Sequence, residues 1–101
     1  MTPRVQFRQA AEDDLEAIWN YVVQSAGRDK ADTLVRSLYD TTVLLAEQPL
    51  MGRAREDLRR DLRSFVVRPY VIYYEALDER AGIAVVRIMR GERDVTPFYF
   101  R

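Results

Sequence analysis

The chain has 101 residues, of which 48% are hydrophobic, with no histidine, no cysteine and a formal net charge of zero. This length predicts one domain, residues 1–101. The absence of histidine and cysteine excludes or nearly excludes disulfide frameworks, zinc enzymes, Ser-His-Asp hydrolases and Cys-His proteases. No apolar run approaches the ~20 residues of a membrane span, and no long apolar segment follows the first charges as in a signal peptide. We therefore expect a cytoplasmic protein with no metal, no cofactor and no membrane partner.

The charges are unevenly distributed. Residues 11–48 carry eight acidic and three basic side chains, whereas residues 52–70 carry six arginines and three acidic residues. Fifteen of the sixteen basic residues are arginine, whose planar fork suits carboxylate and phosphate groups. A genome rich in arginine codons would also explain the arginine content. The segregation still indicates an acidic helical side and a basic sheet edge.

The first half of the chain predicts one strand and two helices. Residues 4–8 alternate apolar and polar side chains, as a short strand does. Residues 10–26 follow the helical period with acidic residues in the first turn, and Gly27 is placed to end this helix in a left-handed cap. Asp29 can cap a second helix, which Pro49 stops. The short gap between the helices predicts an antiparallel hairpin.

The second half predicts three strands, at residues 62–67, 70–77 and 83–89, because these runs are rich in Val, Ile and Tyr. Their short connections, at 68–69 and 78–82, favour an antiparallel meander. The predicted fold is α+β with the order β-α-α-β-β-β. A helical hairpin packs on one face of a mainly antiparallel four-stranded sheet, and the first strand runs beside one of the later three.

Three tyrosines fall on one predicted strand. Because successive side chains alternate between faces, Tyr73 must face opposite to Tyr70 and Tyr74. We expect one set to pack under the helices and the other to be partly exposed on the open face of the sheet. An exposed aromatic set on a small sheet would be a partner surface.

Five motifs, in this order and with this spacing, resemble the ParE branch of the ParE/RelE superfamily of bacterial toxins. They are Ala11-x-x-Asp14-Leu15-x-x-Ile18-Trp19-x-Tyr21, Pro49-x-x-Gly52-Arg53, Leu62-Arg63-Ser64, Tyr70-x-Ile72-Tyr73-Tyr74 and Arg90-Gly91-Glu92-Arg93-Asp94. The resemblance covers about residues 4 to 94. It implies a RelE/ParE-like fold and the toxin of a type II toxin–antitoxin pair, neutralised by a ParD-like antitoxin. ParE-type toxins are understood to poison DNA gyrase, whereas RelE-type toxins cleave mRNA in the ribosomal A site.

The resemblance and the side-chain chemistry suggest two surfaces. We expect the antitoxin to contact Trp19, Tyr21, Val22, Leu38, Arg53 and Arg55. We expect the target to contact, and toxicity to require, Arg63, Tyr70, Arg87, Arg90, Arg93 and Tyr99.

Structural alternatives stay open for several of these residues. Arg63 could form an ion pair with Asp61 or Glu75, and Trp19 could belong to the core. Arg53 and Arg55 could be solvated loop residues. Arg93 and Asp94 could pair with neighbours and fix the tail.

The main functional alternative is a RelE-like, ribosome-dependent mRNA endonuclease. RelE-like enzymes use arginine, lysine and tyrosine near the sheet, but the single lysine, Lys30, lies in the predicted helical hairpin. Arg90 stands where family members often carry histidine, which removes an acid–base group. The zero net charge also argues against a ribosome-binding enzyme. We therefore expect action by binding, with no catalytic residues and no nucleic acid bound by the protein alone; a relic that binds only its antitoxin is a third possibility.

Overall fold

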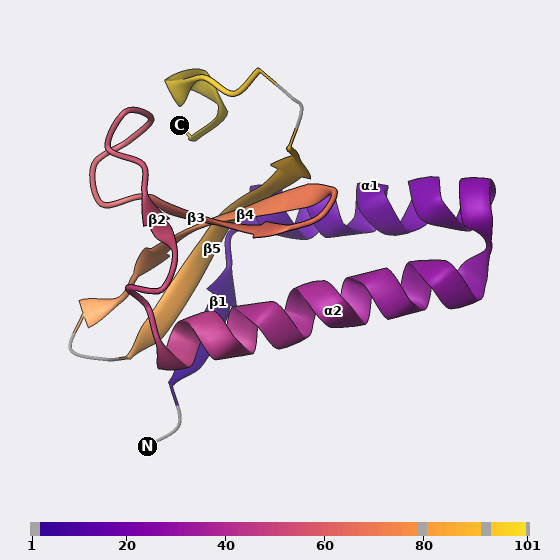
Figure 1. Cartoon of the computed structure of the whole chain (residues 1–101), viewed down its shortest axis with the longest axis horizontal. Coiled ribbons are helices and arrows are strands. Elements are labelled where there is room, and N and C mark those ends of the chain that lie inside the picture. Colours follow the sequence, from indigo (N-terminus) through magenta and orange to yellow (C-terminus); the bar gives the residue numbers. More distant parts are fainter. Residues whose placement is uncertain (1–2, 79–80, 92–93, 101) are drawn as a thin grey trace.

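The computed structural model describes residues 3–78, 81–91 and 94–100. Two helices cover one face of a five-stranded sheet whose strand order is β1-β5-β4-β3-β2 (Figure 1). The C-terminal segment crosses to the other side of the sheet, away from the helices (Figure 1). The predicted α+β class and the helical hairpin on the sheet are confirmed.

The helical hairpin consists of α1, Gln9–Ala26, and α2, Arg28–Glu47. Gly27 alone separates them and has the positive φ of 93° that favours glycine, but its ψ of 167° lies outside the left-handed helical region expected for it. The prediction that Asp29 caps α2 is wrong, since Gly27 is the N-cap and no side chain bonds the cap. Asp29 instead lies in the first turn of α2, where the helix dipole favours an acidic group.

The sheet combines parallel and antiparallel pairs. Strand β1, Arg4–Phe7, runs parallel to β5, Gly82–Arg90, while β4, Tyr70–Ala76, pairs antiparallel with both β5 and β3, Arg63–Val67. The predicted count of four strands is wrong by one, because residues Arg53–Ala54 form a short strand, β2, against β3. Two residues in an arginine-rich connection carry no strand periodicity, so only their contact with β3 makes them a strand.

The face of the sheet that meets the helices contains the larger core. Tyr70, Ile72 and Tyr74 from β4 pack there against α1 and α2. Tyr73 lies on the opposite face, as the alternation predicted. The register shifts between Tyr73, which pairs with Arg87, and Tyr74, which pairs with Val85, so Val86 is an extra residue of β5, as in a β-bulge.

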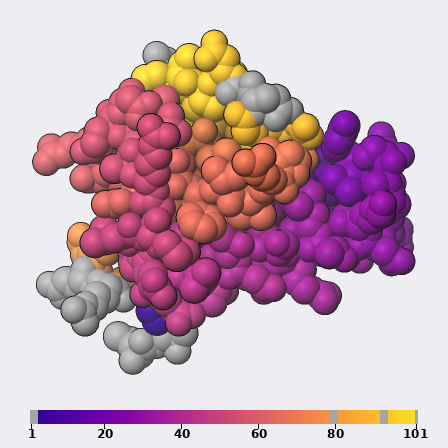
Figure 2. Space-filling model, in the orientation of Figure 1, coloured from indigo at the N-terminus to yellow at the C-terminus, as the bar shows by residue number. Residues whose placement is uncertain are grey.

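The opposite face is also covered, which overturns the prediction that aromatic side chains lie exposed on it. Tyr73 is buried beneath Phe100, with their rings 5.0 Å apart and edge to face. Phe100 belongs to the 3-10 helix η2, Pro97–Phe100, and the loop before β3 adds Leu58 and Leu62 to the same cluster. Figure 2 shows this C-terminal segment in yellow beside that loop.

Tyr74 joins the end of α2 to the edge of the sheet. Its hydroxyl donates to the Pro49 carbonyl and accepts from the Gly52 backbone N–H, each at 2.8 Å. Burial raises the pKa of Tyr74, so the phenol stays protonated and can donate. A Cβ at Gly52 would lie 2.3 Å from this hydroxyl, which is why the turn before β2 needs glycine.

Candidate functional site

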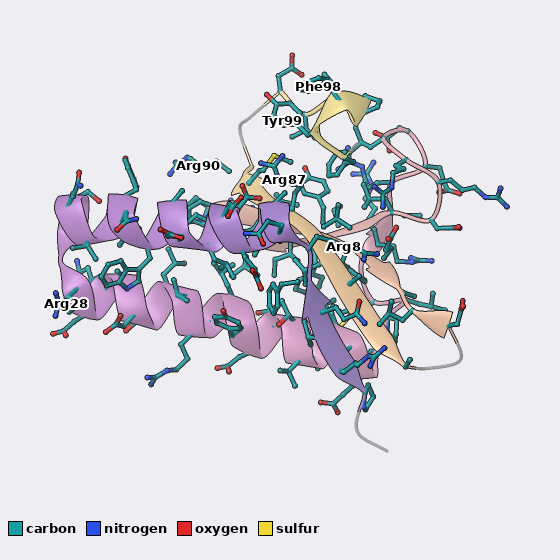
Figure 3. The ribbon with its side chains drawn as sticks, turned by 180° about the vertical axis from the view of Figure 1, so that it is seen from behind. Arg8, Arg28, Arg87, Arg90, Phe98 and Tyr99 are labelled. Carbon is teal, nitrogen blue, oxygen red and sulfur yellow. The ribbon has the colours of Figure 1, made fainter. Side chains whose placement is uncertain are left out.

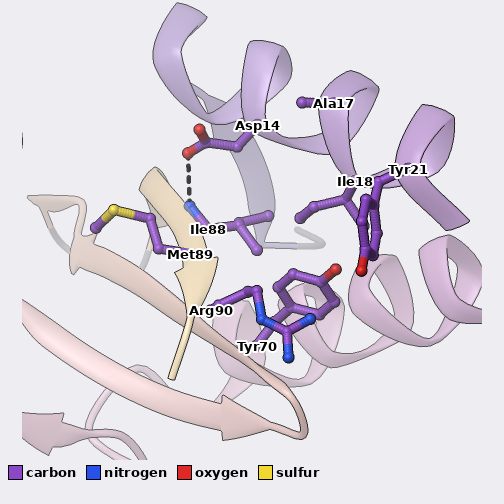
Figure 4. Close-up of a pocket in the computed structure, with 8 residues that line it drawn as sticks. All are labelled: Asp14, Ala17, Ile18, Tyr21, Tyr70, Ile88, Met89 and Arg90. Carbon is purple, nitrogen blue, oxygen red and sulfur yellow. Dashed lines mark hydrogen bonds between the residues drawn. The ribbon is translucent and has the colours of Figure 1, made fainter. Parts of the chain in front are cut away.

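The candidate site starts where β1 stops and β5 continues. Strand β1 pairs with β5 only as far as Val85, so the outer edge of β5 beyond this point faces α1. There the carboxylate of Asp14 accepts a hydrogen bond from the Ile88 backbone N–H at 2.9 Å (Figure 4). It also accepts hydrogen bonds from the Arg87 Nε at 2.8 Å and Nη2 at 2.9 Å, which makes a bidentate ion pair.

Arg87 connects this ion pair to the C-terminal segment. Its Nη1 donates to the Tyr99 carbonyl at 3.2 Å, and its guanidinium lies 5.9 Å from the centre of the Tyr99 ring. Figure 3 shows Arg87 beneath this segment, with Tyr99 and Phe98 above it. The hydrogen bond to Asp14 is the main reason that the pKa of Arg87 is raised, so Arg87 is charged at any physiological pH.

A second arginine fixes the end of the same segment. Arg59 donates to the Phe100 carbonyl and, at 2.6 Å, to Glu75, which also accepts from Arg8 at 3.1 Å. Burial alone would raise the pKa of Glu75, but the hydrogen bonds from Arg59 and Arg8 outweigh it and lower the pKa below its usual value. These groups border a cavity of about 450 Å³ lined by Arg8, Gln9, Ala10, Arg59, Glu75, Val86, Arg87, Tyr99 and Phe100.

A smaller hollow of about 180 Å³ lies between α1 and the ends of β4 and β5 (Figure 4). The guanidinium of Arg90 lies over the Tyr70 ring at 5.8 Å, and Tyr21, which is 60% exposed, stands across from them. The lining is mainly apolar, with Asp14 at one side and Arg90 at the other. It consists of Asp14, Ala17, Ile18, Tyr21, Tyr70, Ile88, Met89 and Arg90.

The residues expected to contact the antitoxin occupy different environments. Tyr21 is exposed, whereas Trp19 is half-buried and donates from Nε1 to Asp32 at 2.9 Å, which links α1 to α2. Val22 is partly buried against the core. Leu38 is fully buried in the core beneath α2, so assigning it to the antitoxin surface is a mistake.

The two arginines of the expected antitoxin surface also occupy different environments. Arg53 is exposed on β2 at the edge of the sheet. Arg55 binds Asp57 through two hydrogen bonds of 3.1 Å and lies 5.9 Å from the Tyr73 ring. The hydrogen bond from Arg55 lowers the pKa of the Asp57 carboxyl.

Among the residues expected to contact the target, the structure brings together Arg87, Arg90, Tyr70 and Tyr99 around the C-terminal end of β5. Tyr70 is almost completely buried, and the guanidinium of Arg90 lies over its ring, so Arg90 rather than Tyr70 is exposed to a partner. Arg93 lies outside the described residues.

Arg63 lies on β3, apart from that group. Its Nη1 donates to the Gly52 carbonyl at 2.7 Å, so its structural partner is backbone rather than Asp61 or Glu75, and Glu75 bonds Arg8 and Arg59 instead.

Sequence reasoning missed the roles of Asp14 and Arg59. Asp14 belongs to the first of the five motifs that resemble the ParE branch, and its place in that motif was the only feature of the sequence that pointed to it. Arg59 lies in the arginine-rich connection and gave no signal. The exposed apolar side chains also concentrate unexpectedly on the second half of α2 and the turn after it, at Tyr39, Val43, Leu44, Leu50 and Met51.

The arginines that face the C-terminal segment bind carboxylates and backbone carbonyls, an arrangement that fixes a surface in place. Arg28, at the start of α2, lies at the far end of the helical hairpin from that segment, and Lys30 follows two residues later on the same helix (Figure 3).

Among the described residues, no three acidic side chains are placed to hold a metal ion. Neither helix in the described part of the chain is both long and apolar enough to cross a membrane.

The sequence matches a family model described as "ParE toxin of type II toxin-antitoxin system, parDE" over residues 5–95. The protein named Toxin ParE1 from Mycobacterium tuberculosis is 30% identical over 95 residues, which cover 94% of this chain and 96% of that protein. Toxin ParE1 from Caulobacter vibrioides is 35% identical over 75 residues, covering 74% of this chain and 73% of that protein.

Two solved structures share the fold. A chain of the "Chromosomal ParDE TA system from P. aeruginosa" superposes with a TM-score of 0.75 at 22% identity, covering 90% of this chain and 98% of that chain. A chain of the intact E. coli RelBE toxin–antitoxin complex superposes with a TM-score of 0.63 at 18% identity, covering 88% of this chain and 96% of that chain. At these identities the likeness extends to the fold alone.

Proposed function

The chain belongs to the ParE toxin family of type II toxin–antitoxin systems, and we propose that it inhibits DNA gyrase by binding and is neutralised by a ParD-like antitoxin in the cytoplasm. The observation that carries the proposal is the family match, which spans both helices and the sheet except for Arg4, the first residue of β1. The solved relative from a ParDE system supports a ParD-like partner.

The proposed antitoxin surface lies on the helical hairpin and the adjoining sheet edge. Tyr21 is exposed on α1, beside Trp19 and Val22, and the exposed apolar residues of α2 add to the hairpin's apolar surface. A segment that is disordered alone and folds on binding would lay an amphipathic helix on such a surface. Acidic residues in that segment would meet Arg53 and Arg55, which affects the association rate more than the affinity.

The proposed target surface lies at the C-terminal end of β5 and on η2. Arg90 is exposed over Tyr70, and Phe98 is 65% exposed beside Tyr99, with the two rings 6.2 Å apart and edge to face. Aromatic and arginine side chains are the ones that most often dominate binding energy at protein interfaces. Action by binding is further supported by the absence of histidine and cysteine and by the ion pairs and carbonyl bonds of the nearby arginines.

The test is the supercoiling of relaxed plasmid by purified gyrase, with and without the protein, and then with the product of the adjacent upstream gene. Inhibition that this product reverses is the expected result. Phe98→Ala should weaken inhibition, whereas Arg36→Ala, on an exposed position of α2, should not. Normal supercoiling in the presence of folded protein would overturn the gyrase target. Cleavage of ribosome-bound mRNA by the same protein in a separate translation assay would instead establish the endonuclease alternative.

A further inference from the structure

We propose that Asp14 is a positioning residue that acts through Arg87 to hold the C-terminal tail, residues 94–100, in the orientation that presents Phe98. That this tail meets the target rests on the proposed function above. That Asp14 sets the position of the tail does not, and it can be tested without any target.

The first step is the attachment of α1 to β5. Asp14 accepts three hydrogen bonds, two from the Arg87 guanidinium and one from the Ile88 backbone, at 2.8 to 2.9 Å. The side chains of Asp14 and Arg87 are only 14% and 20% exposed. The pair therefore fixes the direction of the guanidinium more strongly than an exposed ion pair would.

The second step runs from the guanidinium to the tail. The remaining Nη1 of Arg87 points to the Tyr99 carbonyl, and the adjacent Phe100 carbonyl accepts from Arg59. Phe100 then buries its ring against Tyr73, while Phe98, two residues earlier, faces solvent. The hydrogen bonds to the Tyr99 and Phe100 carbonyls and the burial of the Phe100 ring thus set the orientation in which the tail exposes Phe98.

The third step is what happens when Asp14 loses its charge. An amide at this position would place an NH2 group against the guanidinium, and the mostly buried Arg87 would lose its ionic partner. Arg87 would then reorient toward water to recover its hydrogen bonds, and the Tyr99 carbonyl would lose its donor. The tail would open more often, while the apolar core beneath the helices would keep its contacts.

The experiment compares Asp14→Asn with Asp13→Asn, the matched control one residue earlier on α1. Asp13 is exposed and accepts from Gln9 at 2.9 Å, so the control removes the same charge without touching Arg87 directly. Cleavage by chymotrypsin at the tail aromatics, followed by mass spectrometry, should be about tenfold faster in Asp14→Asn than in the native protein or the control, because cleavage follows the population of the open tail. The tail amide resonances in NMR spectra should shift and sharpen in the same variant only.

Equal cleavage in Asp14→Asn and the native protein, with unchanged tail resonances, would overturn the inference. If Asp14→Asn unfolds, Arg87→Lys provides the second test. Lysine keeps the charge opposite Asp14 but lacks the planar fork that bonds Asp14 and the Tyr99 carbonyl together, so faster tail cleavage is again expected. Tail cleavage at the native rate in a folded Arg87→Lys protein would overturn the inference as well.

The same variants separate this inference from the proposed function. If the native protein does not inhibit gyrase but Asp14→Asn still releases the tail, only the proposed target is wrong. If the native protein inhibits gyrase and Asp14→Asn inhibits it equally while its tail stays protected, only the positioning role is wrong. If both hold, Asp14→Asn should inhibit gyrase less, with antitoxin affinity unchanged.

Discussion

The two faces of the sheet are closed by different means. The face toward the helices is closed by apolar packing of Leu38, Leu45 and their neighbours against β4 and β5. The other face is closed by the loop before β3 and by the tail, whose buried ring, Phe100, is held by arginines bonded to backbone carbonyls. We expect the first arrangement to stabilise the whole fold and the second to open locally without unfolding the rest. The tail, which we propose contacts the target, lies on the second face.

The largest expected effect lies on the helix-covered face. Leu38→Ala should lower the free energy of unfolding by about 2–5 kcal/mol, because it opens a cavity in a fully buried site. Urea denaturation measures this. Leu44→Ala, on the same helix but 43% exposed, is the control and should cost far less. Equal losses for the two variants would mean that the helices do not pack as described.

Tyr74→Phe tests how much polar bonding contributes to the same face. Removing the hydroxyl leaves the Gly52 N–H and the Pro49 carbonyl without this partner, which should cost about 1–3 kcal/mol in urea denaturation. Tyr39→Phe, at an exposed position on α2, should be nearly neutral. A neutral Tyr74→Phe would show that water replaces both bonds.

Phe100→Ala tests whether the tail-covered face opens separately. Truncating a buried phenylalanine in a core often costs 3–5 kcal/mol, but we expect only about 1–2 kcal/mol in global unfolding here, because the tail can detach alone. Hydrogen exchange of the tail amides should rise much more than that of β4. A loss in global stability as large as that of Leu38→Ala would contradict the contrast between the two faces.

Glu75→Gln should have the smallest effect, about 1 kcal/mol at neutral pH, because its arginine partners are partly exposed. The pKa of Glu75 is lowered in the folded protein from its usual 4.5, so its contribution is fully present above about pH 5 and is lost as the pH falls below 4.5. The difference between native protein and variant in urea denaturation should therefore shrink from pH 7 toward pH 3. A difference that grows on acidification would contradict this sign.

Local sequence patterns predicted the helices and the three later strands well. The predicted boundaries of α1, β3, β4 and β5 differ from the observed ones by at most one residue at either end, because residues 10–26 follow the helical period and the three strands are rich in Val, Ile and Tyr. The alternation of the tyrosines also placed Tyr73 correctly. Strand β2 was missed because its two residues become a strand only by pairing with β3.

The candidate site was less predictable, because its bonds join residues far apart in the chain. Arg87 was predicted to meet the target, but its contacts with Asp14, 73 residues away, and with the Tyr99 carbonyl were not predicted. The extra residue in β5, Val86, was likewise not predicted, because no local pattern marks it.

By itself, the sequence determined the class of fold, the order of the elements and the resemblance to ParE toxins, because these depend on local periodicity and on motifs that can be read in order. Only the tertiary structure decided that the second face of the sheet is covered and that Asp14 reaches β5 and, through Arg87, the tail. The physical reason is that burial and ion-pair geometry are properties of segments brought together by folding, and a side chain's own neighbours in the sequence do not specify them.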